Sequence, residues 1–418
     1  MRPRRLQWSA CLLLSCGSHQ PEPGPPATGT VSPTPSLAPQ VLEAIPLAQA
    51  LTQSQAFLAT RPEFETPLGV GLKTPPGLGS LSAESCGACH TEIYEEWRVS
   101  THAAAWTDRQ YQAEIGKSGN RWLCLNCHTP LLVQQDLWPV GLQDGDVEAP
   151  LLVPNPSYDA SLREEGITCA ACHVRDGAIH GPGLADSTPP HPVVADPQFT
   201  STAICERCHQ ATATYPGKPF ICTFDSGGEW RAGPYDELGI ECQDCHMPRS
   251  ERPAANGGPT RTVASHWWRG AGIPKTEGVH PPREANPPGL ALDVRWEGAG
   301  VVVTATNASA GHMLPTGDPE RWVQVDLQFV DAEGAPLGES ESERFGQDWE
   351  WWPEPKELGD TRLAPKDSRT WTVPAPAAAS SVQVRASSHR LSAETAEYHH
   401  LDNYPRSVQT HAIDVPKG

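Results

Sequence analysis

The pattern of apolar and polar positions along the chain changes near residue 288. After that point, short segments alternate apolar and polar side chains, and a period of two is typical of β-strands that bury one face. The alternating or β-rich segments are 290–296, 300–306, 322–330, 370–373, 382–385 and 408–413. Several short strands separated by Gly, Asn, Asp and Pro turns predict an all-β sandwich over residues 289–418.

The chain before residue 288 has a different pattern. Leucines at helical spacing within residues 41–60 predict one amphipathic helix, although Pro46 weakens its start. The segments around this helix are rich in Pro, Ser, Thr and Gly, so residues 16–80 are predicted to form a tether. Residues 81–288 combine short helical segments with loop-rich stretches, which predicts a helix-and-loop domain with little β structure.

The first residues resemble an export signal. Three arginines precede a brief apolar stretch, and the LLSC sequence that ends at Cys16 resembles a bacterial lipoprotein signal whose cysteine is acylated. We therefore predict a signal peptide over residues 1–15 and lipidation at Cys16. Gly17 in place of an aspartate favours an outer-membrane lipoprotein in the periplasm or at the cell surface. The alternative is an ordinary signal peptide cut elsewhere, because the apolar stretch is short and contains Gln7 and Ser9.

Composition adds two constraints. Only 38% of the 418 residues are hydrophobic and 7% are aromatic, so the chain has difficulty building a large conventional core. The formal net charge of −19 argues against nucleic acid or an anionic membrane surface as a partner, and favours a basic or weakly docking protein. No apolar run after the signal approaches the ~18 residues that span a bilayer, so membrane contact is expected only through a lipid anchor.

Five Cys-x-x-Cys-His motifs lie in the predicted helix-and-loop domain. Two cysteines on one helical turn present their thiols to the two vinyl groups of one haem, and the adjacent histidine then lies under the iron as its proximal ligand. The motifs predict five covalently bound haem c groups, whose apolar rings would also supply the missing core. The thioether cysteines would be Cys86, Cys89, Cys124, Cys127, Cys169, Cys172, Cys205, Cys208, Cys242 and Cys245. The proximal histidines would be His90, His128, His173, His209 and His246.

Zinc and disulfides are the alternatives for this set of cysteines. Paired Cys-x-x-Cys segments occur in tetrahedral zinc sites, and closely spaced cysteines occur in disulfide frameworks. Neither explains a histidine directly after every second cysteine. Of the 13 cysteines, ten belong to the motifs, Cys11 and Cys16 lie in the signal, and Cys222 remains. We predict that Cys222 is a buried free thiol.

The sixth ligand of each iron decides between electron transfer and catalysis. Beyond the initiator, only Met247 and Met313 are present, so His/Met coordination cannot serve five irons. Five of the 16 histidines belong to the motifs, which leaves eleven elsewhere. The count therefore favours bis-His coordination, which suits low-potential electron transfer.

The segment CGACHTEIYEEWRVSTHAAAW, from Cys86 to Trp106, resembles the opening of the cytochrome c-554-like (cytochrome c-552/4) multihaem family. In that pattern a haem motif is followed by a short helix with Ile93 and Trp97 at helical spacing, and then by Ser-x-His. The resemblance implies a multihaem fold, and it implies that His102 is a distal ligand of a neighbouring haem.

Three further segments resemble other parts of the same family pattern. CAACHVRDGAIHGP implies His180 as a distal ligand, HPVVADPQFTSTAICERCHQ implies His191, and CQDCHMPRS followed by ASHWWRGAG implies His266. His280 is a reserve candidate, mainly as the alternative to His191. The remaining histidines of the β-rich part are expected to be ordinary surface residues: His389, His399, His400 and His411.

The segment TNASAGHMLPTGDPERW resembles the Gly-His-x-x-Pro-Thr-Gly element found where such haem domains precede an immunoglobulin-like domain. The resemblance implies that the C-terminal sandwich is immunoglobulin-like. It also implies that His312, at a turn, reaches across to a haem as the fifth distal ligand. The alternative is that this element is only a structured hairpin corner.

Three functions are compatible with these features. Electron transfer, in partnership with redox proteins such as other cytochromes, is favoured because six-coordinate irons exclude substrate, and no catalytic residue is assigned. An oxidoreductase acting on a small nitrogen or sulfur compound would need one open haem, as the resemblance to relatives such as hydroxylamine oxidoreductase allows. A subunit of a haem filament is the third possibility. The chain is predicted to be an electron carrier rather than an enzyme.

Overall fold

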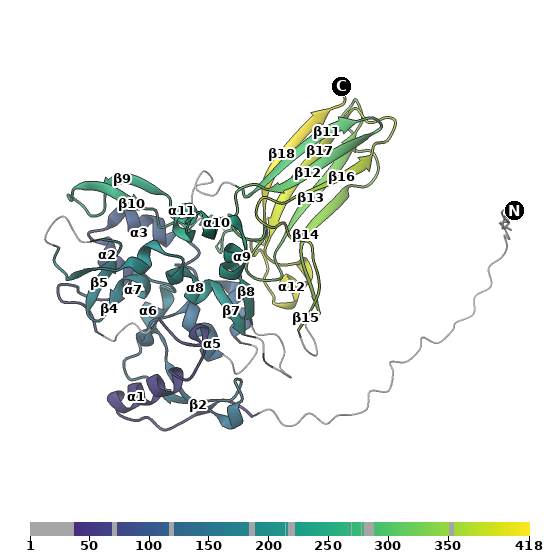
Figure 1. Ribbon diagram of the computed structural model, residues 1–418. Coiled ribbons are helices and arrows are strands. Elements are labelled where there is room, and N and C mark those ends of the chain that lie inside the picture. The colour runs from purple at the N-terminus through teal and green to yellow at the C-terminus, as the bar shows by residue number, and fades with distance from the viewer. Residues whose placement is uncertain are drawn as a thin grey trace, which may run out of the picture. The chain divides into compact units, whose positions relative to one another are not determined.

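Two antiparallel β-sheets form the C-terminal part of the computed structural model, which describes residues 37–68, 73–116, 121–183, 189–213, 215, 222–268, 270–276, 278–279, 288–350 and 355–418 (Figure 1). The smaller sheet has the order β11 (Leu290–Glu297), β12 (Gly300–Asn307) and β16 (Ser368–Pro374). The larger sheet has the order β15 (Lys356–Asp360), β14 (Glu341–Glu350), β13 (Trp322–Val330), β17 (Ser381–His389) and β18 (Ser407–Pro416). Every segment that the sequence predicted as a strand here lies in one of these strands, so the prediction of C-terminal antiparallel β structure is confirmed.

Alternating side chains along these strands build one shared core. Along β13 nearly every second residue is buried, and Val325 joins Val303 and Val384 in a hydrophobic cluster to which both sheets contribute. Full burial of such a side chain contributes about 1.5–3 kcal/mol. Strands β14 and β15 were not predicted, because most of their residues are exposed and carry no alternation.

Short helices, loops and small sheets make up the part of the chain before residue 288, as predicted. The helices are α1 (Leu47–Leu58), α2 (Ala83–Gly87), α3 (Thr91–Arg98), α4 (Arg109–Ile115), α5 (Arg121–His128), α6 (Ala160–Glu164), α7 (Cys169–His173), α8 (Ala203–His209), α9 (Ser226–Ala232), α10 (Pro234–Glu237) and α11 (Cys242–His246). The strands are β1 (Gln40–Val41), β2 (Leu137–Leu142), β3 (Pro150–Pro154), β4 (Val174–Arg175), β5 (Ala178–Gly181), β6 (Val193–Ala195), β7 (Gln210–Ala213), β8 (Cys222–Asp225), β9 (Arg249–Pro253) and β10 (Thr260–Ala264). Four short 3₁₀ helices complete the described elements, at Glu63–Glu65, Leu132–Gln134, Gln143–Gly145 and Pro197–Thr200.

The apolar core of this helical part is divided. Its buried side chains fall into separate small clusters, centred for example on Leu131, on Trp122 and on Trp138, and no cluster approaches the size of the one between the C-terminal sheets. A chain poor in apolar residues therefore does not fill this part with its own side chains.

Residues 37–68, inside the span predicted as a tether, pack against the helical part. Strand β1 pairs with β3, and α1 lies beside β2 with Ala50 and Leu58 buried (Figure 1). Helix α1 begins at Leu47, directly after Pro46, because proline lacks the backbone N–H that an interior helical position needs. The helix expected within residues 41–60 is therefore present and shorter.

Some predictions fall on residues outside the described ranges. These are the signal peptide over residues 1–15, the lipidation site Cys16 and the reserve ligand His280. Among the described helices, none combines the length and the apolar character needed to cross a membrane.

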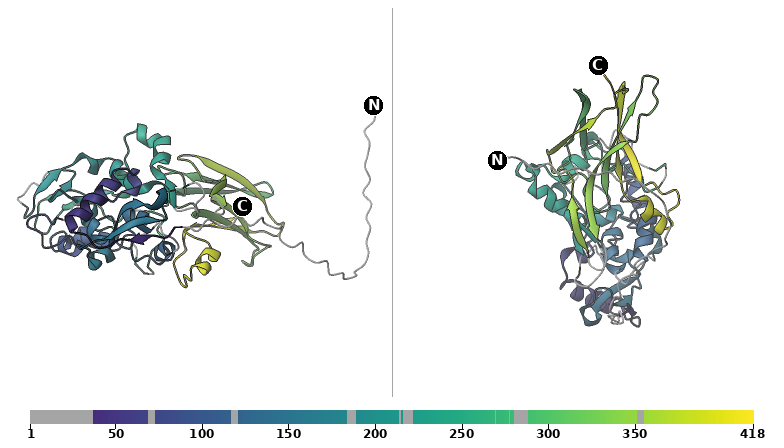
Figure 2. Two further views of the ribbon diagram at one scale, coloured as in Figure 1. Left: turned by 90° about the horizontal axis from the view of Figure 1, so that it is seen from below. Right: turned by 90° about the vertical axis from the view of Figure 1, so that its right-hand side faces the viewer.

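Residues 37–418 form one compact unit, and Glu229 in α9 joins its helical and β-rich parts. Arg362 donates to this carboxylate with an Nη1–Oε1 distance of 2.6 Å, and the Thr316 hydroxyl and the Met313 backbone N–H also donate to it. These bonds fix the turn that contains His312 against α9. Figure 2 shows helix α12 (Ala393–Tyr398), which lies between strands β17 and β18 in the chain and belongs to the β-rich part.

Candidate haem-binding site

The five motifs lie on or next to short helices. Helices α5, α7, α8 and α11 each end at a motif histidine, and α7 and α11 consist of nothing but the five motif residues. In the first motif Cys86 lies in α2, and His90 is the N-terminal cap residue of α3. Residues three apart on a helix share one face, so the motifs within α5, α7, α8 and α11 each present both thiols on one side.

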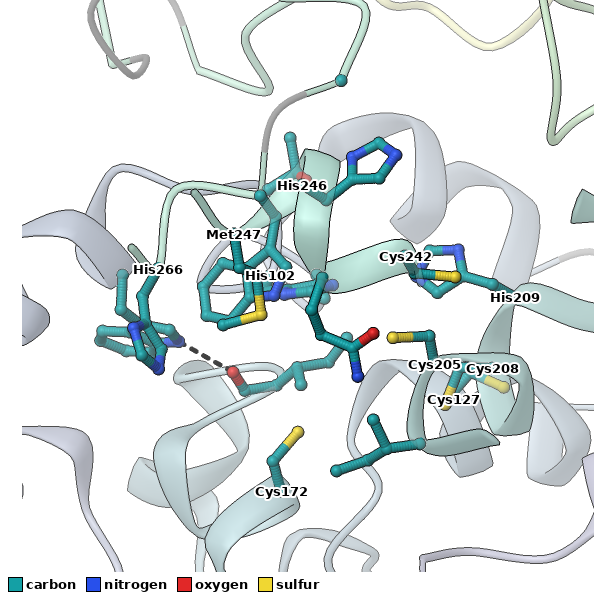
Figure 3. A pocket seen from close by; sticks show the side chains of 18 of the residues that line it. His102, Cys127, Cys172, Cys205, Cys208, His209, Cys242, His246, Met247 and His266 are labelled. Carbon is teal, nitrogen blue, oxygen red and sulfur yellow. Dashed lines mark hydrogen bonds between the residues drawn. The ribbon is translucent and has the colours of Figure 1, made fainter. Parts of the chain in front are cut away.

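All ten cysteines and all five histidines of the motifs border one cavity. Its volume is about 3150 Å³, several times the roughly 300–1,000 Å³ of an ordinary small-molecule pocket. The five predicted distal histidines also line it: His102, His180, His191, His266 and His312. Figure 3 shows several of these residues around the cavity. The space and the lining fit several haems better than a single ligand.

Three predicted distal histidines face a motif histidine across this cavity. The ring centres are 6.2 Å apart for His102 and His209, 6.3 Å for His173 and His266, and 6.1 Å for His246 and His312. A metal–imidazole bond is about 2 Å long, so two imidazoles on opposite sides of one iron have ring centres about 6 Å apart. The spacing of each pair is that of two axial ligands.

Comparisons with known proteins point to the same chemistry. Residues 85–144 match the family described as cytochrome c554 and c-prime. A solved structure, a penta-haem cytochrome c552 from Thermochromatium tepidum, aligns over 82% of this chain and 100% of its own, with a TM-score of 0.59 and 20% sequence identity. That likeness shows the fold. No curated protein matches the chain at a significant level.

The chain is a multihaem c-type cytochrome. Its haem is attached covalently through Cys-x-x-Cys-His motifs, and the family implies a place outside the cytoplasm. The haem number and the ligand of each iron remain predictions.

Hydrogen bonds orient the imidazoles of the cytochrome for metal binding. Nδ1 of His90 donates to the Ala254 carbonyl at 2.6 Å, and Nδ1 of His128 donates to the Ala105 carbonyl at 2.8 Å. Nδ1 of His266, a predicted distal ligand, donates to a backbone carbonyl at 3.1 Å. When Nδ1 carries the proton, Nε2 presents its lone pair, which is the arrangement that a metal needs.

Burial keeps these imidazoles in the neutral form that ligates iron. It lowers the pKa of His102 and His266 to about 3, and that of His128 and His209 to about 4. All four are therefore unprotonated near neutral pH.

The motif histidines His128 and His90 differ from the three motif histidines of the facing pairs. The Tyr111 ring stacks on His128 with centres 3.7 Å apart and planes 4° apart, so it covers one face of that imidazole. Among the described residues, neither His128 nor His90 has another histidine at the spacing of the three facing pairs.

The two other predicted distal ligands, His180 and His191, do not face a motif histidine at that spacing in the described part of the chain. His180 donates from Nδ1 to Asp196 Oδ2 at 3.1 Å, and Nδ1 of His191 is buried without a hydrogen-bond partner.

Thiols of different motifs lie close to one another in three places. The pairs are Cys86 with Cys169, Cys127 with Cys208, and Cys205 with Cys242. Figure 3 shows the side chains of the last two pairs. Each pair joins the attachment points of two haems, so the edges of those haems would be close. Within the described ranges, no three Cys, His, Asp or Glu side chains converge on a point, as a tetrahedral zinc site would require.

Sequence reasoning missed several residues of the cavity. His399 was expected to be a surface residue, and this was wrong: its side chain is 5% exposed and Nε2 lies 2.8 Å from Glu114 Oε1. Lys275, Arg321 and Arg390 also line the cavity and were not singled out. No motif marks these positions, because they face the cavity only through tertiary packing.

Proposed function

We propose that this cytochrome transfers electrons through five covalently bound haem c groups whose irons are mainly bis-His ligated. The observation that carries the proposal is the single cavity bordered by all ten motif cysteines, all five motif histidines and all five candidate distal histidines. The likeness to a penta-haem cytochrome supports the number of haems. Bound haem c supplies one-electron redox chemistry.

The side chains of the chain would attach, orient and enclose the haems. The motif cysteines hold them, and the motif histidines are the proximal ligands. The three facing pairs support a distal role for His102, His266 and His312. His180 and His191 are the candidates for the first two motifs. An iron with two imidazole ligands has no position for substrate, so these residues favour electron transfer over catalysis.

The close thiol pairs support an order for the haems. They join the first motif to the third, the fourth to the fifth, and the second to the fourth. Cys172 of the third motif lies near enough to Cys205 to act on its charge, which joins the third motif to the fourth. We therefore infer a connected set of redox centres in which the fourth haem has the most neighbours.

The C-terminal part would contribute to this set directly. We infer that its two sheets form an immunoglobulin-like sandwich, because both contribute to one core. Its turn at His312 reaches the cavity and is fixed there by the bonds to Glu229. On this proposal the second domain supplies an iron ligand.

The same proposal includes the cellular setting. We infer an exported protein, anchored as a lipoprotein through Cys16, that exchanges electrons with other redox proteins. The formal charge of −19 favours a basic docking surface on that partner.

A second candidate is an oxidoreductase acting on a small nitrogen or sulfur compound at one open haem. The surroundings of His128 favour it, because Tyr111 covers its ring and, in the described part of the chain, no second imidazole faces it at ligand spacing. Such an iron would be high-spin and reactive.

Mass spectrometry and low-temperature spin-state spectroscopy of the purified protein test both candidates. Five haems per chain and five low-spin irons that ignore added nitrite or hydroxylamine support electron transfer. One high-spin iron that binds either compound would favour the enzyme instead. Fewer than five attached haems would contradict both forms of the proposal.

A further inference from the structure

Three cationic side chains meet at the edge of the cavity. Lys275 forms an ion pair with the buried Asp108, and Arg390, 5% exposed, donates to the Tyr404 hydroxyl at 2.6 Å. Arg321 lies near enough to Arg390 and Asp108 for their charges to act on it. In a chain of formal charge −19, three cations at one buried place need an explanation.

Two of these cations, Arg390 and Lys275, have hydrogen-bond or ion-pair partners. Arg390 donates to the carbonyls of Ile273 at 2.6 Å and Pro274 at 3.1 Å, so it holds the segment that leads into Lys275. The Lys275 ammonium is paired with Asp108, which also accepts from the Tyr404 hydroxyl at 2.6 Å. Both cations are fixed in position.

The guanidinium of Arg321 has no such partner among the described residues. Its Nε is buried without a hydrogen-bond partner, and over the described ranges its guanidinium takes part in no hydrogen bond or ion pair. Asp318, the acidic residue whose charge acts most strongly on Arg321, is exposed. Burial lowers the pKa of Arg321, which expresses the cost of an uncompensated charge. A planar guanidinium in this state fits a carboxylate, which accepts two parallel N–H bonds.

The cluster lies beside two haem motifs. The charge of Lys275 acts on His128, and the charge of Arg321 acts on His209. The Cys127 thiol of the first of these motifs lies close to the Cys208 thiol of the other. Haem c carries two propionate carboxylates, and Arg321 and Lys275 line the same cavity as the motif residues, so they border the space into which these carboxylates would extend.

We propose that Arg321, with Lys275 beside it, forms a carboxylate-binding site that holds a propionate of the haem attached at the second or fourth motif, and thereby sets its reduction potential. The inference rests on the proposed haem content. On this proposal Arg321 binds the propionate directly and places a positive charge near the iron. That charge favours the reduced state, which carries one positive charge less.

Redox titration of the holoprotein, followed by visible spectroscopy, tests the site. In Arg321→Gln one reduction step is expected to move to a more negative potential, while mass spectrometry still finds five haems. Arg321→Lys, which keeps the charge, is expected to recover most of the shift. The matched control is Arg369→Gln, because Arg369 pairs with Glu343 at 2.9 Å outside the cavity. It should leave every step unchanged.

Two results would overturn the inference. Unchanged potentials in Arg321→Gln with five haems attached would show that no haem carboxylate lies there, and Lys275→Gln gives the same test if the first variant does not fold. A shift in the wild type on adding sodium phosphate or sodium nitrite at constant ionic strength, absent in Arg321→Gln, would assign the site to a free oxyanion. Fewer than five haems in the wild type would contradict the proposed function instead.

Discussion

The imidazoles of His246 and His312 face each other with ring centres 6.1 Å apart and planes 21° apart, although His246 ends α11 and His312 belongs to the β-rich part. Nδ1 of His312 donates to the Met313 carbonyl at 2.9 Å, which leaves Nε2 to point away from its own turn. The same turn is bound to Glu229, so the geometry does not depend on the two imidazoles alone. On the proposed function, this relationship would make the C-terminal part a component of the redox site.

Replacing His312 tests that relationship. In His312→Ala we expect all five haems to stay attached, because thioether bonds do not involve the distal ligand, and one iron to become high-spin. Low-temperature electron paramagnetic resonance measures the spin states, and mass spectrometry counts the haems. His411→Ala, a histidine of β18 outside the cavity, is the control. An unchanged spectrum in His312→Ala would remove the β-rich part from the ligand set.

Asp196 provides a test of His180 as a ligand. Its carboxylate accepts from His180 Nδ1 at 3.1 Å, and such an acceptor makes an imidazole a stronger donor to the oxidised iron. In Asp196→Asn we expect one reduction step to move to a more positive potential, by about 60 mV for each tenfold loss in the preference for the oxidised state. Asp293→Asn, at an exposed position of strand β11, is the control. A titration identical to the wild type would argue that His180 does not bind iron.

The parts of the site that could be predicted from the sequence are those set by local geometry. Cysteine, cysteine and histidine at fixed offsets share one helical turn wherever that turn lies, so the motif residues could be assigned without the fold. Strand β13 was predictable for the same reason, because its buried face recurs at every second residue. Strand β14 has no such face and was missed.

The contacts made by tertiary packing could not be derived in this way. Nothing in the neighbourhood of His102 indicates that His209 faces it, and only a family resemblance suggested a ligand role. His399 carries the ordinary sequence context of a surface residue, yet it is buried against Glu114 of α4. Arg321 precedes a strand and has no motif, so its place in the cavity follows only from the fold.

Glu96 is expected to stabilise the distal side of the third motif. This carboxylate is 7% exposed, accepts from the His266 backbone N–H at 2.8 Å and pairs with Arg252 at 2.8 Å. Glu96→Gln keeps the size of the side chain and leaves Arg252 less well compensated, so we expect a loss of about 3 kcal/mol, the lower end for breaking a buried pair. Thermal unfolding of the holoprotein measures it, with the exposed Glu95→Gln as control. A double-mutant cycle with Arg252→Gln should show strong coupling between the two sites; independent, additive effects would contradict the assigned contact.

Acid stability should depend on Asp136. Burial alone would raise the pKa of this carboxyl, but Arg163, which donates to it at 2.5 Å, and the nearby Arg121 outweigh burial and hold the pKa below its usual value. A carboxyl whose pKa is lower in the folded state stabilises the fold above its unfolded pKa of about 3.9, and this contribution is lost as the pH falls through the folded value. Because Asp136 is partly exposed, the effect should be modest, about 1 kcal/mol. Asp136→Asn should therefore lower stability at pH 7 and flatten the loss of stability below pH ~4. Denaturant unfolding across this pH range measures both effects. If the free energy of unfolding falls with pH equally steeply in the variant and the wild type, Asp136 does not cause the loss of stability in acid.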